Sequence, residues 1–113
     1  RDSFLIIKRS GYKHLNNLWE LPSGKTLTKN NPHPQLEELL KNKFKLEVTI
    51  KNKIGEIRHR YSHFGITLSG FHCRLINGSK PEVNRPFRWI RLNEINQYAF
   101  PKANHKLFNL MQE

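Results

Sequence analysis

Cysteine is almost missing from this chain of 113 residues, which contains only Cys73. One thiol excludes an internal disulfide framework and is typical of a protein in a reducing cytosol. Long hydrophobic runs are missing as well, because no apolar stretch approaches the roughly 20 residues that a membrane helix needs. No segment resembles a signal peptide. We therefore expect a cytoplasmic protein with no membrane partner.

Acidic residues are scarce: 9 Asp and Glu stand against 20 Lys and Arg, which gives a net charge of +11. Such an excess favours a polyanionic partner, because each phosphate contact releases condensed counterions. An ordinary solvated surface of a chain rich in Lys and Asn is the alternative. The charge is concentrated in two places, however. One cluster precedes Tyr61 and comprises Lys51, Lys53, Arg58 and Arg60, and a second comprises Arg85, Arg88 and Arg91.

The length permits one domain with a single core, and 12 aromatic residues are available to fill it. The first residue is Arg1 and not Met, so we expect residues 1–113 to be one domain of a longer protein. Hydrophobic periodicity predicts a helix with Pro34 as its first residue and Phe44 near its end, and a final helix from about residue 102. Strands are predicted at residues 4–7, 18–21, 48–60, 64–76 and 87–92, with a short helix at 94–97.

This order of elements indicates an α/β fold in which a mixed, twisted sheet is packed between helices. The long strand at residues 64–76 changes its buried face, so we expect a bulge or bend at Ser69 and Gly70. Glu37 and Glu38 suit the positive end of the helix dipole. We expect Trp19 and Trp89 in the core, and Cys73 as a buried strand thiol.

Residues 24–46 have the spacing and apolar skeleton of a Nudix box, G-x5-E-x7-R-E-U-x-E-E-x-G-U, where U is bulky and apolar. The U positions fall on Leu40 and Leu46. The glutamates of a working box bind Mg²⁺, which polarises a pyrophosphate. Here those positions fall on Asn30, Leu39, Asn42 and Lys43. A leucine, two asparagines and a lysine cannot supply that metal site, so the segment resembles a Nudix box that has lost its catalysis.

Three further segments narrow the resemblance. Residues 18–25 (LWELPSGK) are similar to the start of many Nudix boxes, residues 58–64 (RHRYSHF) followed by 66–68 (ITL) resemble the Phe-Ser-His loop of the A/G-specific adenine glycosylases, and residues 98–101 (YAFP) resemble their closing segment. The chain is therefore similar over nearly its whole length to the C-terminal domain of the MutY family. One departure is Tyr61, where the family often has Phe.

The resemblance implies a Nudix fold that does no chemistry and recognises 8-oxoguanine opposite a mispaired adenine in double-stranded DNA. It also implies a separate N-terminal domain, absent here, that removes the adenine and carries a 4Fe–4S cluster. We thus expect no cofactor or metal site in this chain, and a place in base-excision repair at the bacterial nucleoid.

By the same resemblance, lesion recognition falls on Tyr61, Ser62 and His63. Oxidised guanine has a carbonyl at C8 and a proton at N7, and a hydroxyl such as that of Ser62 can pair with either. Tyr61 is expected to stack on a base and His63 to orient the loop. Without the resemblance, Ser62 reads as an ordinary serine at a strand end. Phosphate contacts are expected from Arg58, Arg60, Lys51 and Lys53, for which a charged, solvated edge strand is an equal alternative.

A divergent Nudix hydrolase acting on nucleoside diphosphate derivatives is the alternative function. It requires acids from outside the box, for which Glu20, Glu56, Glu82 and Glu94 are the candidates. A zinc site at His59 and His63 is disfavoured, because four residues of strand separate them by about 13 Å. His72 and Cys73 are adjacent and point to opposite faces of a strand.

Overall fold

The computed structural model describes residues 3–9, 18–25, 32–76 and 78–112. Asn30, one of the replaced box glutamates, lies outside them. The elements, in chain order, are β1 (Phe4–Lys8), β2 (Trp19–Glu20), α1 (His33–Phe44), β3 (Val48–Arg60), β4 (Gly65–Leu75), β5 (Phe87–Ile90), a 3₁₀ helix η1 (Leu92–Gln97) and α2 (Lys102–Met111). No helix of these ranges is both long and apolar enough to cross a membrane.

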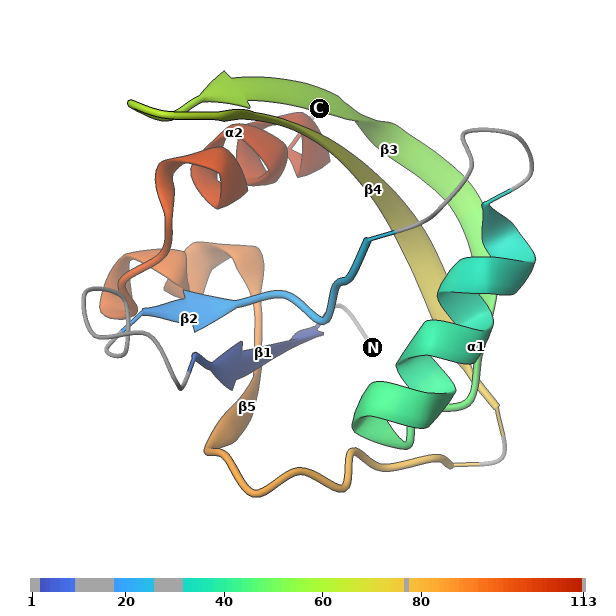
Figure 1. Cartoon of the computed structure of the whole chain (residues 1–113). Coiled ribbons are helices and arrows are strands. Elements are labelled where there is room, and N and C mark those ends of the chain that lie inside the picture. Colours follow the sequence, from blue (N-terminus) through green and yellow to red (C-terminus); the bar gives the residue numbers. More distant parts are fainter. Residues whose placement is uncertain (1–2, 10–17, 26–31, 77, 113) are drawn as a thin grey trace.

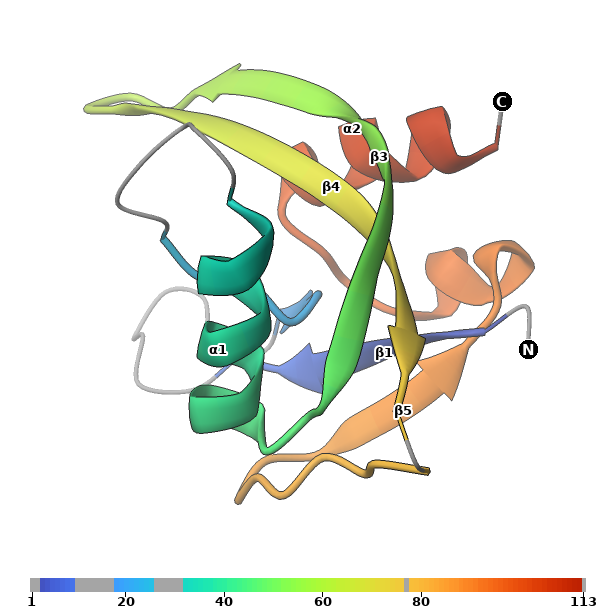
Figure 2. The same ribbon diagram turned by 90° about the vertical axis from the view of Figure 1, so that its right-hand side faces the viewer.

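The strands form two antiparallel sheets. One has the order β2-β1-β5, and the other is the β3–β4 hairpin. The mixed sheet expected from the sequence is therefore replaced, in the described residues, by antiparallel pairs alone. The hairpin arches over the first sheet, with α1 on one side and α2 beneath it (Figures 1 and 2). The predicted order of strands and helices is confirmed.

Strand β1 separates two hydrophobic cores because its successive side chains point to opposite faces. Leu5 and Ile7 join the core beneath α1, where Phe44 is fully buried. Ile6 points the other way and joins the core around Phe108 of α2. Each helix is thus fixed by its own core.

Helix α1 begins one residue earlier than predicted, at His33, so Pro34 occupies its second position and not its first. It ends at Phe44, and the left-handed φ of 59° at the following Lys45 turns the chain so that the Leu46 N–H donates to the Leu40 carbonyl at 3.2 Å. The carboxylate of Glu37 accepts a hydrogen bond from the Ile50 N–H at 2.9 Å. Glu37 therefore ties α1 to β3. The first turn of α1 contains no acidic residue, so the predicted role of Glu37 and Glu38 at the helix dipole is wrong.

The β3–β4 hairpin packs closely on α2 through two cross-strand glycines, Gly55 and Gly70. A Cβ on Gly70 would stand 2.6 Å from a methyl of Leu107, and one on Gly55 would stand 2.7 Å from a methyl of Leu110. Side chains at either position would push the helix away. The two glycines therefore let α2 lie flat against the hairpin.

A bulge or bend was expected at Ser69 and Gly70, and the pairing does shift beside Gly70, but the prediction is wrong in placing the irregularity on β4. The register shifts lie on the opposite strand, between Ile50 and Gly55 of β3, where extra residues interrupt the pairing. These shifts bend β3 so that its first half packs on α1 and its second half on α2. Beyond α2 the hairpin continues to an exposed tip at residues 61–64 (Figure 1).

Two predicted core residues lie at the surface. Trp89 is 44% exposed, although it pairs with Leu5 and so lies on the same sheet face as the core beneath α1. Cys73 is also exposed, and the expectation of a buried thiol is wrong. Partial desolvation of the thiol, together with the charge of the nearby Glu37 carboxylate, nevertheless raises the pKa of Cys73.

Candidate nucleic-acid interface

The degenerate box places an apolar side chain and a cation where a working box has carboxylates. Leu39 fills the space beside Gly24 so closely that a Cβ on that glycine would collide with it. Lys43 reaches the same loop and donates a hydrogen bond from Nζ to the Ser23 carbonyl at 3.3 Å. An ammonium at this carbonyl repels a divalent cation. This side of α1 is therefore built to hold the loop and not a metal.

The candidate replacement acids are mostly engaged elsewhere. Glu20 pairs with Arg85 at 3.2 Å and lies 3.9 Å from Arg9. Glu56 pairs with Lys53 at 2.8 Å, and Glu94 accepts from the Arg91 N–H at 2.8 Å. Among the residues that the structure places, no group of three His, Cys, Asp or Glu side chains gathers as a metal site would require. These carboxylates serve ion pairs and a helix cap.

The hairpin tip is a tight turn that exposes the three predicted lesion-reading residues in different degrees. Its ends are joined by a hydrogen bond from the Tyr61 N–H to the Phe64 carbonyl at 2.7 Å. Ser62 and His63 occupy the apex and are exposed, whereas Tyr61 is half-buried. The Ser62 hydroxyl forms no hydrogen bond with another described residue. It is therefore available to a ligand.

Two aromatic rings close the base of this turn. The rings of Tyr61 and Phe64 lie 5.1 Å apart with an angle of 35° between their planes. Phe64 is 58% exposed, which is unusual for so large an apolar side chain in this molecule. The sequence predicted Phe64 as the first residue of a strand and the last of the RHRYSHF segment, with no role of its own in recognition. Its exposure and its pairing with Tyr61 make it part of the candidate site.

His59 packs against the ring of Tyr61, a contact that the sequence did not predict. The two rings meet edge to face at 4.5 Å. Lys106 of α2 lies with its Nζ 2.8 Å from His59 Nδ1, so the imidazole accepts a hydrogen bond from the ammonium. Partial desolvation, followed by the charges of Lys106 and Lys102, lowers the pKa of His59 below its usual 6.5. His59 is therefore neutral at physiological pH.

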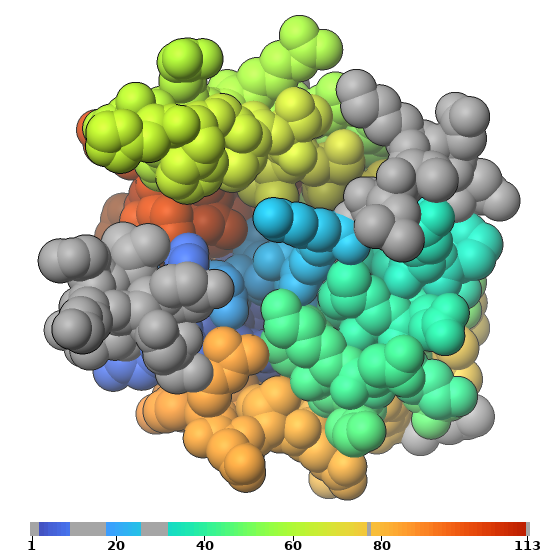
Figure 3. Space-filling view, viewed as in Figure 1, coloured from blue at the N-terminus to red at the C-terminus, as the bar shows by residue number. Residues whose placement is uncertain are grey.

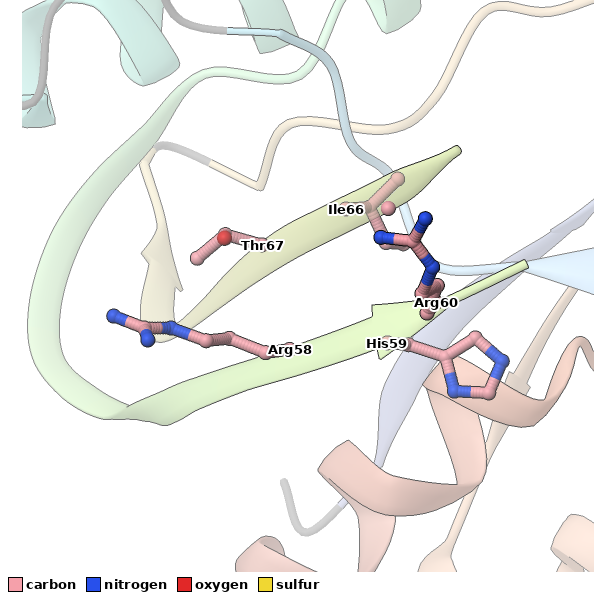
Figure 4. A pocket seen from close by; sticks show the side chains of 6 residues that line it. Arg58, His59, Arg60, Ile66 and Thr67 are labelled. Carbon is pink, nitrogen blue, oxygen red and sulfur yellow. The ribbon is translucent and has the colours of Figure 1, made fainter. Parts of the chain in front are cut away.

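The predicted phosphate-binding residues divide into two groups. Arg58 and Arg60 are both exposed and alternate with His59 along β3, and Figure 4 shows the Arg58 side chain extending in a direction different from that of His59. With His59 of β3 and with Gly65, Ile66 and Thr67 of β4, they line an open hollow of about 280 Å³. Lys51 is exposed near the register shifts. Lys53, by contrast, is neutralised by Glu56 and is a weaker candidate.

The second basic cluster is largely used inside the fold. Arg85 pairs with Glu20, and Arg88 lies over the Trp19 ring at 5.8 Å while donating to the Phe87 carbonyl. Arg58 and Arg60 of the hairpin, by contrast, form no ion pair with a carboxylate of the described residues. In the space-filling view the hairpin forms the upper rim of the molecule, directly above α2 (Figure 3).

Three solved structures share this architecture. They are the E. coli ORF135 protein (TM-score 0.82, 19% identity, 98% of this chain and 80% of that one), a MutT protein from Methanosarcina mazei Go1 (0.76, 15%, 95% and 80%) and the Ap4A hydrolase of C. elegans (0.70, 13%, 97% and 83%). At these identities the likeness concerns the fold alone. It confirms the predicted Nudix fold.

The sequence is also 28% identical to the adenine DNA glycosylase of Rattus norvegicus over 96% of this chain. The chain spans only 22% of the length of that relative. This similarity supports the predicted likeness to the Nudix domain of the MutY family. The family model described as NUDIX domain matches residues 1–110. The chain belongs to the Nudix family, as a MutY-like Nudix domain.

Proposed function

We propose that this chain is the lesion-recognition domain of an adenine DNA glycosylase and reads 8-oxoguanine opposite a mispaired adenine. The observation that carries the proposal is the hairpin tip, where exposed Ser62, whose hydroxyl bonds no described residue, lies in the turn closed by the Tyr61 and Phe64 rings. The similarity to the rat glycosylase supports DNA as the partner.

The tip has the chemistry that this lesion requires. The Ser62 hydroxyl can accept a hydrogen bond from N7–H of 8-oxoguanine or donate one to its O8, because the rotor is free to turn. Tyr61 and Phe64 offer a surface on which a base can stack, and such stacking contributes roughly 1–3 kcal/mol per base. His63, exposed at the apex, is suited to a phosphate or a base edge.

The basic face of the hairpin supplies contacts that are independent of sequence. Arg58 and Arg60 are the first candidates for phosphate binding, with Lys51 behind them. Phosphate contacts of this kind set the position of a protein on the duplex, and base contacts then specify. Removal of adenine, the 4Fe–4S cluster and the location at the bacterial nucleoid belong in this proposal to the longer protein and its N-terminal domain.

A Nudix hydrolase acting on nucleoside diphosphate derivatives is the second candidate. It is favoured by the shared fold with a MutT protein and an Ap4A hydrolase. It is disfavoured by Leu39 and Lys43 in the box and by the ion pairs that engage Glu20 and Glu56.

Equilibrium binding separates the two candidates. The chain is titrated against otherwise identical duplexes that contain 8-oxoguanine:adenine or guanine:adenine, at fixed salt. The proposal expects tighter binding to the lesion duplex and loss of that preference when Tyr61 and Ser62 are both changed to Ala. Equal affinity of the unaltered chain for both duplexes would contradict it.

A further inference from the structure

Helix α2 presents a pair of lysines beside the hairpin. Lys102 and Lys106 are both exposed and stand four residues apart, which places them on one face of the helix. The contact of Lys106 with His59 places this face of α2 against the end of β3 that leads into the tip. Lys102 is close enough for its charge to lower the pKa of His59 as well.

These lysines stand on the opposite side of the hairpin from the arginines. Gly55, Ile57 and His59 alternate on the face of β3 that packs on α2, as the close approach of Gly55 to Leu110 shows. Arg58 and Arg60 necessarily point from the other face. Figure 4 shows Arg58 and His59 leaving β3 in different directions. The tip therefore has a pair of cations on each side.

The α2 lysines retain their charge for a ligand. Neither forms an ion pair with a carboxylate of the described ranges. His59, which accepts from Lys106, is neutral and leaves that ammonium with two further N–H groups. A second, independent anion-binding face is thus available next to the tip.

We propose that Lys102 and Lys106 bind the phosphates of one strand of a DNA duplex while Arg58 and Arg60 bind those of the other. The tip then enters the groove between the two strands. A two-stranded β-ribbon fits the major groove, which is about 12 Å wide and is walled by both phosphate backbones. The inference rests on the proposed function in that its partner is duplex DNA, but it does not require recognition of a lesion.

The salt dependence of binding to undamaged duplex tests the first half of this inference. Each phosphate contact contributes about 0.9 to the slope of log K against log salt concentration. Changing Lys102 and Lys106 to Gln should make the slope shallower by about 1.8, and changing Arg58 and Arg60 to Gln should do the same. The matched control removes two exposed lysines from the other end of the molecule, Lys41→Gln with Lys80→Gln, and should leave the slope unchanged.

A hybrid duplex with one methylphosphonate strand, which is neutral, tests whether the two pairs use different strands. On this duplex only one side of the hairpin meets charge. On the hybrid, each double variant should show the same salt slope as the unaltered chain, because its remaining pair of cations can bind the charged strand. The fourfold variant, in which both pairs are changed to Gln, should lose this part of the salt dependence. Three results would overturn the inference. They are a shallower slope for each double variant on the hybrid, an unchanged slope for the lysine double variant on normal duplex, and no binding of the unaltered chain at low salt. Lesion preference enters none of these measurements, so failure of the proposed function is seen separately.

Discussion

Ser62 is the smallest side chain of the hairpin tip, and its proposed role depends on the hydroxyl alone. Ser62→Ala should leave the fold intact, because the residue is exposed and its hydroxyl bonds no described neighbour. Discrimination between 8-oxoguanine:adenine and guanine:adenine should fall by the worth of one hydrogen bond, about 0.5–1.5 kcal/mol or roughly 2- to 12-fold. The ratio of dissociation constants for the two duplexes measures it.

Ser69 provides the control for that substitution, because it is an exposed serine on the same hairpin but away from the tip. Ser69→Ala should leave the ratio unchanged. The double variant Tyr61→Ala with Ser62→Ala should lose more than the single one, since stacking is removed as well. An unchanged ratio in that double variant, with normal thermal melting, would show that the tip does not read the lesion.

The contact of His59 with Lys106 makes a prediction about titration. Lys106→Gln removes the nearby charge, so the pKa of His59 should rise toward its usual value, as followed by the ring proton shifts in an NMR pH titration. Lys41→Gln should not move it. Because the folded state holds this proton less tightly than the unfolded chain, protonation of His59 disfavours the folded state as the pH falls below 6.5. A His59 pKa that is the same in Lys106→Gln as in the unaltered chain would mean that the ammonium does not contribute to lowering it.

The residues of the site differ in how far the sequence could reveal them. Tyr61, Ser62 and His63 came from the resemblance of residues 58–64 to a loop of the MutY family, and such a resemblance needs only neighbouring residues. The partner of His59 lies 47 positions away in α2, and no local pattern connects the two. The sequence alone does not show whether an apolar residue such as Phe64 is buried or exposed in the folded chain. Contacts made by tertiary packing are thus the part of the site that the sequence did not predict.

At the level of elements, close packing of the hairpin on α2 depends on Gly70. Gly70→Ala would place a Cβ 2.6 Å from a methyl of Leu107, so the helix or its side chain must shift. We expect a loss of about 1–3 kcal/mol of unfolding free energy, as is typical of overpacking. Chemical denaturation of the variant and the unaltered chain measures the difference.

Gly65 is the matched control, because it lies on the same strand but its nearest outside atom would be 3.8 Å from an added Cβ. Gly65→Ala should be neutral or slightly stabilising, since alanine restricts the unfolded chain more than glycine does. Equal stability of the Gly70 and Gly65 variants would mean that α2 does not press on the hairpin as described.

Periodicity located the elements well because it reports burial over several residues. The final helix was expected to start near residue 102, and α2 begins at Lys102. The register shifts of β3 escaped this reasoning. They fall where Lys51, Asn52 and Lys53 are all exposed and polar, so no alternation marks which face each side chain takes. The bulge was instead assigned to the glycine on the partner strand, whose real reason is contact with α2.

Helix α1 leads to a prediction about catalysis. The chain should not hydrolyse 8-oxo-dGTP or ADP-ribose with Mg²⁺, because Leu39, Asn42 and Lys43 replace the carboxylates that would bind the metal. Release of product in the presence and absence of EDTA measures this. Turnover that EDTA abolishes, and that Glu20→Gln or Glu56→Gln removes, would establish the hydrolase instead.

At the scale of the whole molecule, the net charge of +11 sets the expected mode of binding. Arg85 is paired with Glu20 inside the fold, whereas Arg58 and Arg60 of the hairpin and Lys102 and Lys106 of α2 are exposed and form no ion pair with a described carboxylate. If about six phosphates are neutralised, the slope of log K against log salt concentration should be about −5 for undamaged duplex. Fluorescence anisotropy of labelled duplex across a range of salt concentrations measures it. Changing Arg58 and Arg60 to Ala should weaken binding to damaged and undamaged duplexes alike, because phosphate contacts carry no sequence information. Affinity that stays flat between low and physiological salt would contradict an electrostatic origin and leave the excess of lysine and arginine as an ordinary solvated surface.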